Sequence, residues 1–331
     1  MKEIYLDQPQ VMHVRDALPL PLLQDGEVRI KLLYGGICGS DLSVFKGRLP
    51  HAQYPLRPGH EVVGEVIESR ASHINEGKRV VITPNTFCGK CEFCLKGKPN
   101  ICLEKQSIGI TCDGGFAEEL HIHSRYCLPI PDELSNEAAV LIEPLSVIVH
   151  GMKQITIQPG MSVLVVGCGT EGLLAAALAR HVGGEVTAID INASKLAMLR
   201  SFHDMTLGHP MDIAGNQYDV VIEAAGTKQS VESCFSLLKP GGELLLIGIT
   251  PEATIPVAQV VRKEQKIVGS IIYEFPTDFQ TSVTYLLDEQ FDPTVFISKI
   301  KPFYEYEEAY QMALSGNYAK IVLQFKGAAV S

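Results

Sequence analysis

The stretch VLVVGCGTEGLLAA, at residues 163–176, limits the fold more than any other part of the sequence. A continuous apolar run ends in Gly167, Gly169 and Gly172, which have the GxGxxG spacing, and an apolar pattern at helical spacing follows. In a strand–turn–helix unit, the first glycine makes the turn, the second lets the backbone approach a pyrophosphate, and the third permits close helix–strand packing. The helix start would offer free N–H groups to the phosphates. The stretch therefore predicts a dinucleotide site in a doubly wound α/β domain.

Apolar runs and helical patterns continue to alternate after this turn. Strands are expected at 186–189, 218–222, 244–249 and 267–272, with helices at 193–202, where Asn192 is the expected N-cap, and at 229–238. Uninterrupted strands of this kind indicate a parallel sheet covered on both faces. Residues 1–147 instead carry short β-branched runs at 28–33, 62–67 and 79–84, and residues 321–325 form a late strand. We therefore predict an α/β protein with a dinucleotide-binding domain at 148–285 and a β-rich domain made of 1–147 and 286–331.

Asp190 ends the second expected strand of the doubly wound domain, 18 residues after Gly172. An acid at this place accepts the ribose hydroxyls and repels a 2′-phosphate, so the sequence favours NAD over NADP. The plainer alternatives are a surface acid at a strand end and an α/β domain that binds no nucleotide.

Four of the nine cysteines lie within residues 88–102. Their spacing is C-x₂-C-x₂-C-x₇-C, formed by Cys88, Cys91, Cys94 and Cys102. Two-residue gaps let thiolates converge on one tetrahedral ion, and four thiolate ligands leave no open position. The spacing therefore predicts a structural zinc site, with an iron–sulfur cluster as the rival interpretation.

Charge and composition exclude several other classes of function. The net charge of −10 argues against nucleic acid and anionic membranes as partners. No apolar stretch reaches about 18 residues, so no membrane span is expected. The N-terminal residues carry acids where a signal peptide needs an apolar core, and the clustered cysteines suit a reducing compartment, so we expect a cytoplasmic protein.

Three shorter motifs complete a recognisable order. GGICGSD contains Cys38, PGHEVVGEV contains His60 and Glu61, and LIEPLSV contains Glu143. With the four-cysteine segment and the glycine turn, this order resembles the zinc-containing medium-chain alcohol dehydrogenases over essentially the whole chain. The EPLSV motif makes it most similar to the sorbitol (polyol) dehydrogenase branch. The resemblance implies a GroES-like catalytic domain, a Rossmann NAD domain, a catalytic zinc between them, and a homodimer or homotetramer.

The resemblance also implies a role for individual residues. Cys38, His60 and Glu143 correspond to the ligands of a catalytic zinc, which makes two zinc ions per chain, and Glu61 lies beside that site. Asp41 corresponds to the acid that orients the histidine. Ser40 corresponds to the hydroxyl that passes the substrate proton toward solvent, while the hydride of a secondary alcohol goes to NAD. The remaining implied contacts with the cofactor come from Thr170, Glu171 and Gly248.

The sequence departs from the family pattern at three positions. Ser43 replaces a histidine that many relatives use after the relay residue. Glu171 replaces an apolar residue before the last motif glycine. Ile272 and Tyr273 stand where the polyol branch usually has an Arg–Tyr pair, which leaves Tyr273 as a pocket candidate. The connection over residues 201–218 is also short, so one strand or helix there is expected to be abbreviated.

These departures leave other substrates open. An L-threonine-type amino-alcohol dehydrogenase is one alternative. A polyol-phosphate dehydrogenase is another, because Arg48 and Arg57 lie in a loop that could supply positive charge. The alternative outside the enzymes is a non-catalytic nucleotide-binding relative, which the presence of Cys38, His60 and Glu143 argues against.

Overall fold

The computed structural model describes residues 1–213 and 215–325, which form two compact units. The first unit comprises Met1–Glu143, Glu274–Leu287 and the segment from Ile297 onward, and the second comprises Pro144–Tyr273 and Asp288–Phe296. Helix α9 (Thr277–Leu286), which precedes the predicted bound at 285/286, packs against α3 (Asn136–Ala139) within the first unit, with Phe279 fully buried. No helix in the described ranges is both long and apolar enough to cross a membrane.

The first unit is built on a seven-stranded sheet with the order β14-β15-β3-β4-β5-β7, in which β6 also pairs with β3. Its longest strand, β3, pairs antiparallel with β4, β6 and β15, so the C-terminal strand lies in the interior of the sheet. A separate hairpin of β1 and β2 lies at the N-terminus. The strands of this unit are β1 (Lys2–Gln8), β2 (Val11–Asp16), β3 (Glu27–Ile37), β4 (Glu61–Ser69), β5 (Arg79–Ile82), β6 (Glu119–His123), β7 (Cys127–Pro129), β14 (Ile297–Pro302) and β15 (Lys320–Gln324).

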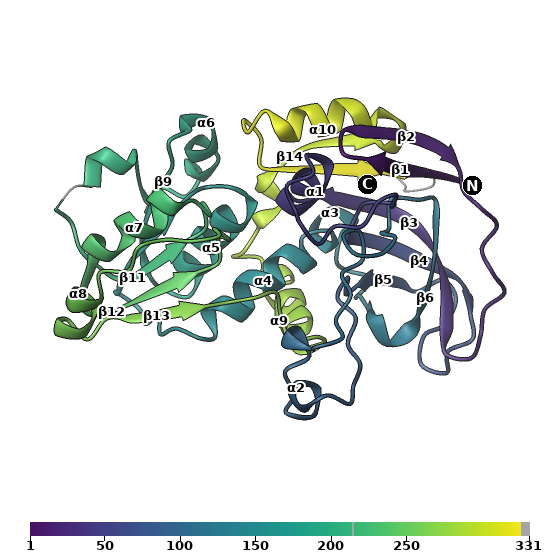
Figure 1. Cartoon of the computed structure of the whole chain (residues 1–331), viewed down its shortest axis with the longest axis horizontal. Helices are drawn as coiled ribbons and strands as arrows, with labels where there is room; N and C mark the ends of the chain where they lie inside the picture. The colour runs from purple at the N-terminus through teal and green to yellow at the C-terminus, as the bar shows by residue number, and fades with distance from the viewer. Residues whose placement is uncertain (214, 326–331) are drawn as a thin grey trace. The chain divides into compact units, whose positions relative to one another are not determined.

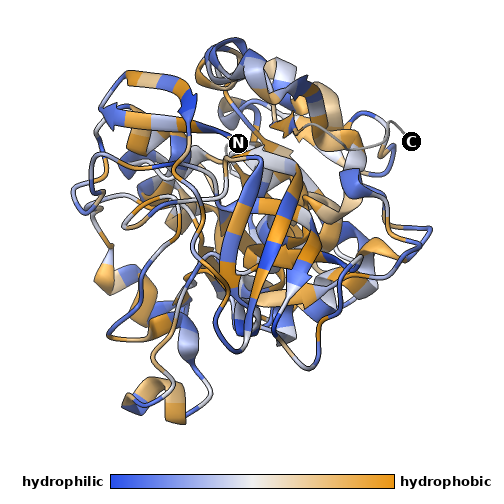
Figure 2. Ribbon diagram, turned by 90° about the vertical axis from the view of Figure 1, so that its right-hand side faces the viewer, coloured by the Kyte–Doolittle hydropathy of each residue, from blue (hydrophilic) through white to orange (hydrophobic). Residues whose placement is uncertain are grey.

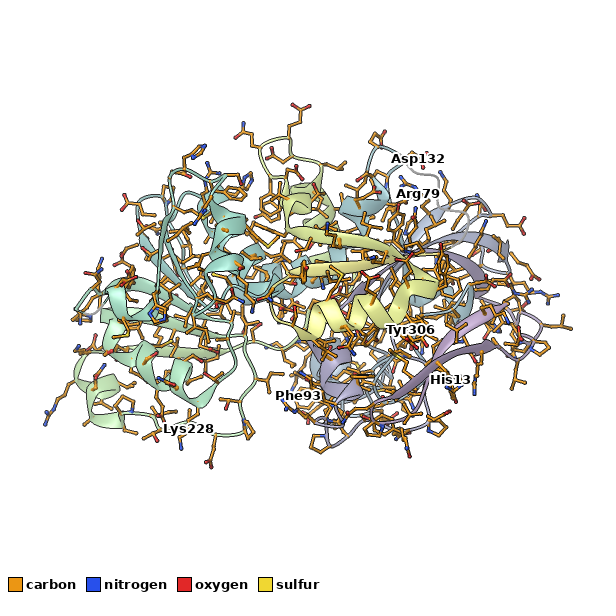
Figure 3. The ribbon with its side chains drawn as sticks, turned by 90° about the horizontal axis from the view of Figure 1, so that it is seen from above. His13, Arg79, Phe93, Asp132, Lys228 and Tyr306 are labelled. Carbon is orange, nitrogen blue, oxygen red and sulfur yellow. The ribbon has the colours of Figure 1, made fainter. Side chains whose placement is uncertain are left out.

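Side chains along these strands alternate between the core and the surface. Along β3, Val28, Ile30 and Leu32 are fully buried, while the residues between them are half-buried. Figure 2 shows this alternation as orange and blue bands along the strands. The core on the buried face extends to Tyr310 and Phe325 near the C-terminus. Short helices close the unit: α1 (Gly39–Phe45), α2 (Glu92–Leu95), α3, α9 and α10 (Tyr306–Leu314). Arg79 holds the loop after β7 through hydrogen bonds to Pro131 O and Asp132 O, and Figure 3 shows Arg79 next to Asp132.

The second unit contains a six-stranded parallel sheet with the order β10-β9-β8-β11-β12-β13. The order reverses direction between β8 and β11, which makes the carboxyl ends of these strands the switch point where open α/β sheets bind ligands. Helices α5, α7 and α8 surround the sheet in Figure 1. The elements are α4 (Ile142–Met152, which begins in the first unit), β8 (Ser162–Val166), α5 (Thr170–His181), β9 (Glu185–Ile189), α6 (Ala193–Leu196), β10 (Thr206–Gly208), β11 (Tyr218–Glu223), α7 (Lys228–Leu237), β12 (Leu238–Leu246), α8 (Val257–Arg262) and β13 (Lys266–Gly269).

The expected abbreviation lies in the connections on either side of β10. Asn192 is the N-cap of α6, and its side chain accepts a hydrogen bond from Ser194 N. The helix expected at 193–202 is reduced to α6 and a 3₁₀ turn that ends at Leu199. After the three-residue β10, a 3₁₀ turn at Pro210–Ile213 stands where a covering helix would lie. All six strands are thus kept, and the helices have been shortened.

Candidate metal centres and dinucleotide site

One group of possible metal ligands lies at the ends of β3 and β4. Ligand atoms of Cys38, His60 and Glu61 all lie within 4.8 Å of one another, and we call these three residues the buried cluster. Cys38 follows β3 and is the N-cap of α1, while His60 and Glu61 stand at the start of β4. Because β3 and β4 are neighbours, with Gly36 opposite Glu61, the sheet brings together two motifs that are separate in the sequence.

Asp41 fixes the orientation of the buried cluster. It is almost fully buried in the first turn of α1, where its Oδ2 accepts a hydrogen bond from Cys38 N at 2.9 Å. Its Oδ1 accepts one from Gly59 N at 3.2 Å and lies 3.2 Å from His60 Nδ1. Burial lowers the pKa of His60, but Asp41 and Cys38 raise it more, and the net shift is well above the usual value. Asp41 Oδ1 thus lies at ion-pair distance from Nδ1, which has no hydrogen-bond partner among the described residues, and Nε2 is the nitrogen that would be left for a metal ion.

Glu61 is neutralised by a lysine that the sequence motifs did not indicate. Lys320 Nζ lies 2.6 Å from Glu61 Oε1 and 2.5 Å from Oε2, and both side chains are fully buried. Lys320 begins β15, on the other side of β3 from β4. The pair passes over Gly36, where a Cβ atom would collide with Glu61 Oε2. Glycine at position 36 is therefore needed to let the two charges meet.

The other residues predicted near the catalytic zinc differ in how they are placed relative to the buried cluster. Ser40 Oγ is 3.1 Å from His60 Nε2, the ring atom left for a metal. Ser43 Oγ donates a hydrogen bond to Gly39 O within α1. Glu143 is buried in the first turn of α4, but it does not belong to the group whose ligand atoms converge within 4.8 Å among the described residues.

The second group of possible metal ligands is the cysteine lobe, which comprises Cys88, Cys91, Cys94 and Cys102. All four sulfur atoms lie within 4.8 Å of one another, with distances of 4.0 Å from Cys88 Sγ to Cys94 Sγ and 3.9 Å from Cys91 Sγ to Cys102 Sγ. A tetrahedral ion with Zn–S bonds of about 2.3 Å requires sulfur–sulfur distances of about 3.8 Å. All four cysteines are free, so the spacing fits one shared ion rather than disulfides.

Backbone N–H groups are arranged around these sulfurs. Cys88 Sγ accepts from Cys91 N at 3.2 Å, and Cys102 Sγ accepts from Cys88 N at 3.3 Å. Backbone hydrogen bonds from Cys94 and Leu103 lower the pKa of Cys91 to about 6, whereas burial raises the pKa of Cys94 to about 12. The lobe extends away from the sheet of its own unit at α2, as Figure 1 shows, and Phe93 in Figure 3 marks that helix.

The glycine turn of the second unit has the geometry that a dinucleotide site requires. Gly167 has φ +91°, and a Cβ there would lie 2.7 Å from Ala225 N. Gly169 is the N-cap of α5, and nothing lies within 4 Å of a Cβ built on it, so the backbone is open to an approaching group. A Cβ at Gly172 would collide with Gly167 O. Each of the three positions therefore favours glycine for a distinct steric reason.

Asp190 lies beside this turn at the end of β9. Its carboxylate accepts hydrogen bonds from Cys168 N at 2.6 Å and from Asn192 N at 2.7 Å. A carboxylate has about four acceptor sites, so both oxygens keep capacity for ribose hydroxyls. A pocket of about 220 Å³ adjoins it, lined by Asp190, Ile191, Ala193, Leu196, Arg200, Leu207, Gly208 and His209.

The remaining predicted residues were expected to contact the cofactor or the substrate, and each lies in a different environment. Thr170 and Glu171 form the first turn of α5, so Glu171 lies at the positive end of the helix dipole. Tyr273 is buried and follows Ile272, which has φ +46°, an unusual conformation for a β-branched residue. Arg57 is buried, and its guanidinium is held by Glu3 at 2.6 Å and by Gly114 O, so it does not offer a free cation for a substrate phosphate.

Comparisons with known proteins match this geometry. The family model of the alcohol dehydrogenase GroES-like domain matches residues 24–132, and that of zinc-binding dehydrogenases matches residues 172–289. D-arabinitol dehydrogenase 1 of Uromyces fabae is 30% identical over 98% of this chain and 97% of its own length. The chain belongs to the zinc-containing medium-chain alcohol dehydrogenase family.

Two further relatives refine this assignment. Sorbitol dehydrogenase of Bacillus subtilis is 29% identical, with 90% of each chain covered. A protein of Sinorhizobium meliloti described as a zinc-binding dehydrogenase, solved with NADP bound, superposes with a TM-score of 0.91 at 27% identity and covers 98% of each chain. The dehydrogenase thus has the GroES-like and Rossmann-type folds that the sequence predicted, and it belongs to the polyol dehydrogenase branch as a zinc-dependent alcohol oxidoreductase with a nicotinamide cofactor.

Sequence motifs missed two buried groups of the dehydrogenase. Lys320 lies 259 positions from Glu61, in a strand with no motif of its own. Glu223 ends β11 and is fully buried beside the glycine turn. In the sequence, each of these two residues is marked only as a charged residue at one end of an apolar run: Lys320 at the start of its strand and Glu223 at the end of its strand.

Proposed function

We propose that the dehydrogenase oxidises a secondary alcohol of a polyol or sugar, with NAD as the hydride acceptor and two zinc ions per chain. The buried cluster carries this proposal, because a thiol, an imidazole and a nearby carboxylate converge where an acid already orients the imidazole. Cys38, His60 and Glu143 are the proposed ligands of the catalytic zinc. The four sulfurs of the cysteine lobe are the proposed ligands of the structural zinc.

Glu61 is proposed to stay outside the coordination of the catalytic zinc. Both of its oxygens are engaged by Lys320, and a metal ion would have to separate a fully buried ion pair to reach them. Three protein ligands then leave one position for the substrate. Zinc at this position would supply a Lewis acid that acidifies the alcohol hydroxyl, and NAD would supply the hydride acceptor.

The proton of the substrate hydroxyl is proposed to leave through Ser40. Ser40 Oγ lies 3.1 Å from His60 Nε2, so it adjoins the atom that faces the substrate position. Asp41, whose Oδ1 lies 3.2 Å from His60 Nδ1, is proposed to orient the imidazole. Beyond Ser40, Ser43 is the next hydroxyl on α1, and water or the cofactor ribose completes the path.

In the Rossmann-type unit, Gly167, Gly169, Thr170, Glu171 and Gly172 are proposed to hold the pyrophosphate end of NAD, with Gly248 behind them. Asp190 is proposed to bind the ribose hydroxyls, which supports NAD over NADP even though a relative has been solved with NADP. Tyr273 is proposed to line the substrate pocket.

We propose a homodimer or homotetramer that forms through the edge of the Rossmann sheet. β13 is the last strand in the sheet order, and the neighbouring helix α8 exposes Val257 and Val261. We also propose a cytoplasmic location, which the nine free cysteines support.

The decisive experiment measures zinc content on protein prepared without chelators, together with NADH formation on a panel of polyols, sugars, polyol phosphates and L-threonine. We expect two zinc ions per chain and turnover on polyols or sugars. Turnover confined to L-threonine or to a phosphorylated polyol would replace the substrate class and keep the zinc chemistry. One zinc per chain with no turnover on any substrate would overturn the proposal.

A further inference from the structure

Glu223 is a buried acid for which the proposed reaction has no use. It is fully buried at the end of β11, and none of the described residues forms an ion pair with it. Its Oε1 accepts three hydrogen bonds, from Ala225 N at 3.0 Å, Gly226 N at 2.9 Å and Ser230 Oγ at 2.6 Å. Hydrogen bonds of this kind satisfy a carboxyl oxygen that is buried away from water.

These donors all belong to the turn that follows β11 and to the first turn of α7. Thr227 is the N-cap of α7, and its Oγ1 accepts from Ser230 N at 3.1 Å. Ser230 Oγ in turn accepts from Thr227 N and donates to Glu223. Lys228, labelled in Figure 3, marks this end of the helix. One carboxylate oxygen thus fixes both the turn and the helix start.

A second turn, after β12, is held by the same residue. The backbone oxygen of Glu223 accepts from Ile247 N and from Gly248 N, both at 3.0 Å. A Cβ built on Gly248 would lie 2.5 Å from Glu223 Oε2. Oε2 is buried and has no hydrogen-bond partner among the described residues. The space of a side chain at position 248 is therefore taken by Gly226 N, with which the built Cβ would also collide, together with the carboxylate of Glu223.

The turn that Glu223 holds packs directly against the glycine turn. A Cβ at Gly167 would lie 2.7 Å from both the N and Cβ atoms of Ala225. Gly226 has φ +65°, and a Cβ there would lie 3.1 Å from Ile249 N. Three strand ends meet here, because β11 pairs with β8 on one side and with β12 on the other. The carboxylate lies at the switch point of the sheet, where dinucleotides bind.

We infer that Glu223 is a positioning residue of the dinucleotide site, which holds the turn at residues 224–227 and the turn at 247–248 in the shape that receives the cofactor. This role rests on the proposed binding of NAD by the same unit. If the turn leaves that shape for part of the time, the apparent dissociation constant rises in inverse proportion to the competent fraction. If only one molecule in about ten had the turn in the competent shape, the apparent dissociation constant would therefore be about tenfold higher.

The test compares Glu223→Ala with Glu243→Ala in the full-length, zinc-loaded chain. Glu243 is a matched control: it lies in β12, is 9% exposed, and accepts from Thr156 N at 2.7 Å, but it lies away from the carboxyl ends of the strands. Dissociation constants for NAD and NADH are measured by calorimetry and NADH fluorescence, and melting temperatures are measured without ligand.

We expect Glu223→Ala to raise both dissociation constants at least tenfold, and to raise KM for NAD with kcat within about threefold of the wild type. Glu243→Ala should change them less than twofold, although both variants lower the melting temperature. Should Glu223→Ala not fold, Glu223→Gln takes its place: it keeps one acceptor oxygen, so we expect a rise of about threefold.

Two outcomes would contradict this inference, and they differ in what else they affect. A wild-type chain that binds both cofactor forms, with a Glu223 variant that binds them equally well, would overturn the positioning role alone. A wild-type chain that binds neither form would overturn the proposed function together with this role.

Discussion

The buried cluster and the cysteine lobe are two groups of possible metal ligands in the first unit, and they are built in opposite ways. The lobe takes its ligands from 15 consecutive residues, Cys88 to Cys102, and three of its four cysteines are only half-buried. The buried cluster takes its residues from the end of β3 and the start of β4, with Asp41 and Lys320 beside them. A local thiolate site needs little from the rest of the fold, whereas a reactive site needs the fold to set its charges.

The largest effect should separate the two sites by activity. Cys38→Ser removes a proposed ligand of the catalytic zinc, and we expect kcat to fall by a factor of about 10³ or more, because the zinc would supply several kcal/mol of transition-state stabilisation. Cys94→Ser should keep kcat per folded molecule within about threefold. Each variant should bind one zinc ion, measured by elemental analysis. Equal loss of activity in both would show that the lobe supports catalysis directly.

The charge pair should produce the next largest effect, on stability. Lys320→Met leaves Glu61 buried without its partner, and we expect the free energy of unfolding to fall by about 3–5 kcal/mol in urea titrations. Lys301→Met removes a half-exposed pair with Glu305 and Glu308, and should cost less than about 1 kcal/mol. The double variant Lys320→Met, Glu61→Met should recover most of the loss. If it recovers nothing, the lysine contributes by packing and not by charge.

A smaller effect should come from the acid that orients His60. Asp41→Asn should weaken zinc binding at the buried cluster by about 10–100-fold, because partners that orient a metal-binding histidine contribute that much. Competition with a chelator measures this affinity, and the lobe zinc should be unaffected in the same titration. Asp113→Asn, whose carboxylate accepts a hydrogen bond from Arg57 N in the same unit, is the control. Weakening of both zinc sites alike would indicate general unfolding.

The smallest effect concerns the choice of cofactor. Asp190→Asn removes a negative charge and keeps one acceptor oxygen, so we expect KM for NADP to fall by about tenfold relative to KM for NAD, which corresponds to about 1.4 kcal/mol. Asp212→Asn, close in sequence to the pocket beside Asp190, should leave the ratio unchanged. An unchanged ratio in Asp190→Asn would remove this residue from cofactor selection.

The same contrast, between features built from neighbouring residues and features assembled by the fold, separates what could be predicted from the sequence from what could not. The glycine turn, the four-cysteine spacing and five of the six strands of the parallel sheet rest on local patterns, and the sequence predicted them, whereas the three-residue β10 has no such pattern. The 3₁₀ turns around β10 were not foreseen as such, because helical periodicity does not reveal how soon a short helix ends. Helix α9 groups with the first unit by its contacts, although the predicted bound at 285/286 put residues 277–285 in the other domain, because a position in sequence does not identify the surface against which a helix packs. Lys320 and Glu223 escaped notice because their partners are defined by strand pairing and turns.

Because β15 lies between β14 and β3, the order in which the chain is synthesised has a consequence for the buried cluster. Cys38, His60 and Glu61 leave the ribosome about 260 residues before Lys320, which is 259 positions after Glu61. Until β15 is made, Glu61 has no counter-charge and β3 has an open edge, so the sheet cannot close around its own acid. The lobe has all its thiols within one short segment and can acquire an ion during translation. A chain cut before residue 320 should therefore keep all four sulfurs of the lobe, but Glu61 would lack its counter-charge and the buried cluster would lack the strand that supplies it.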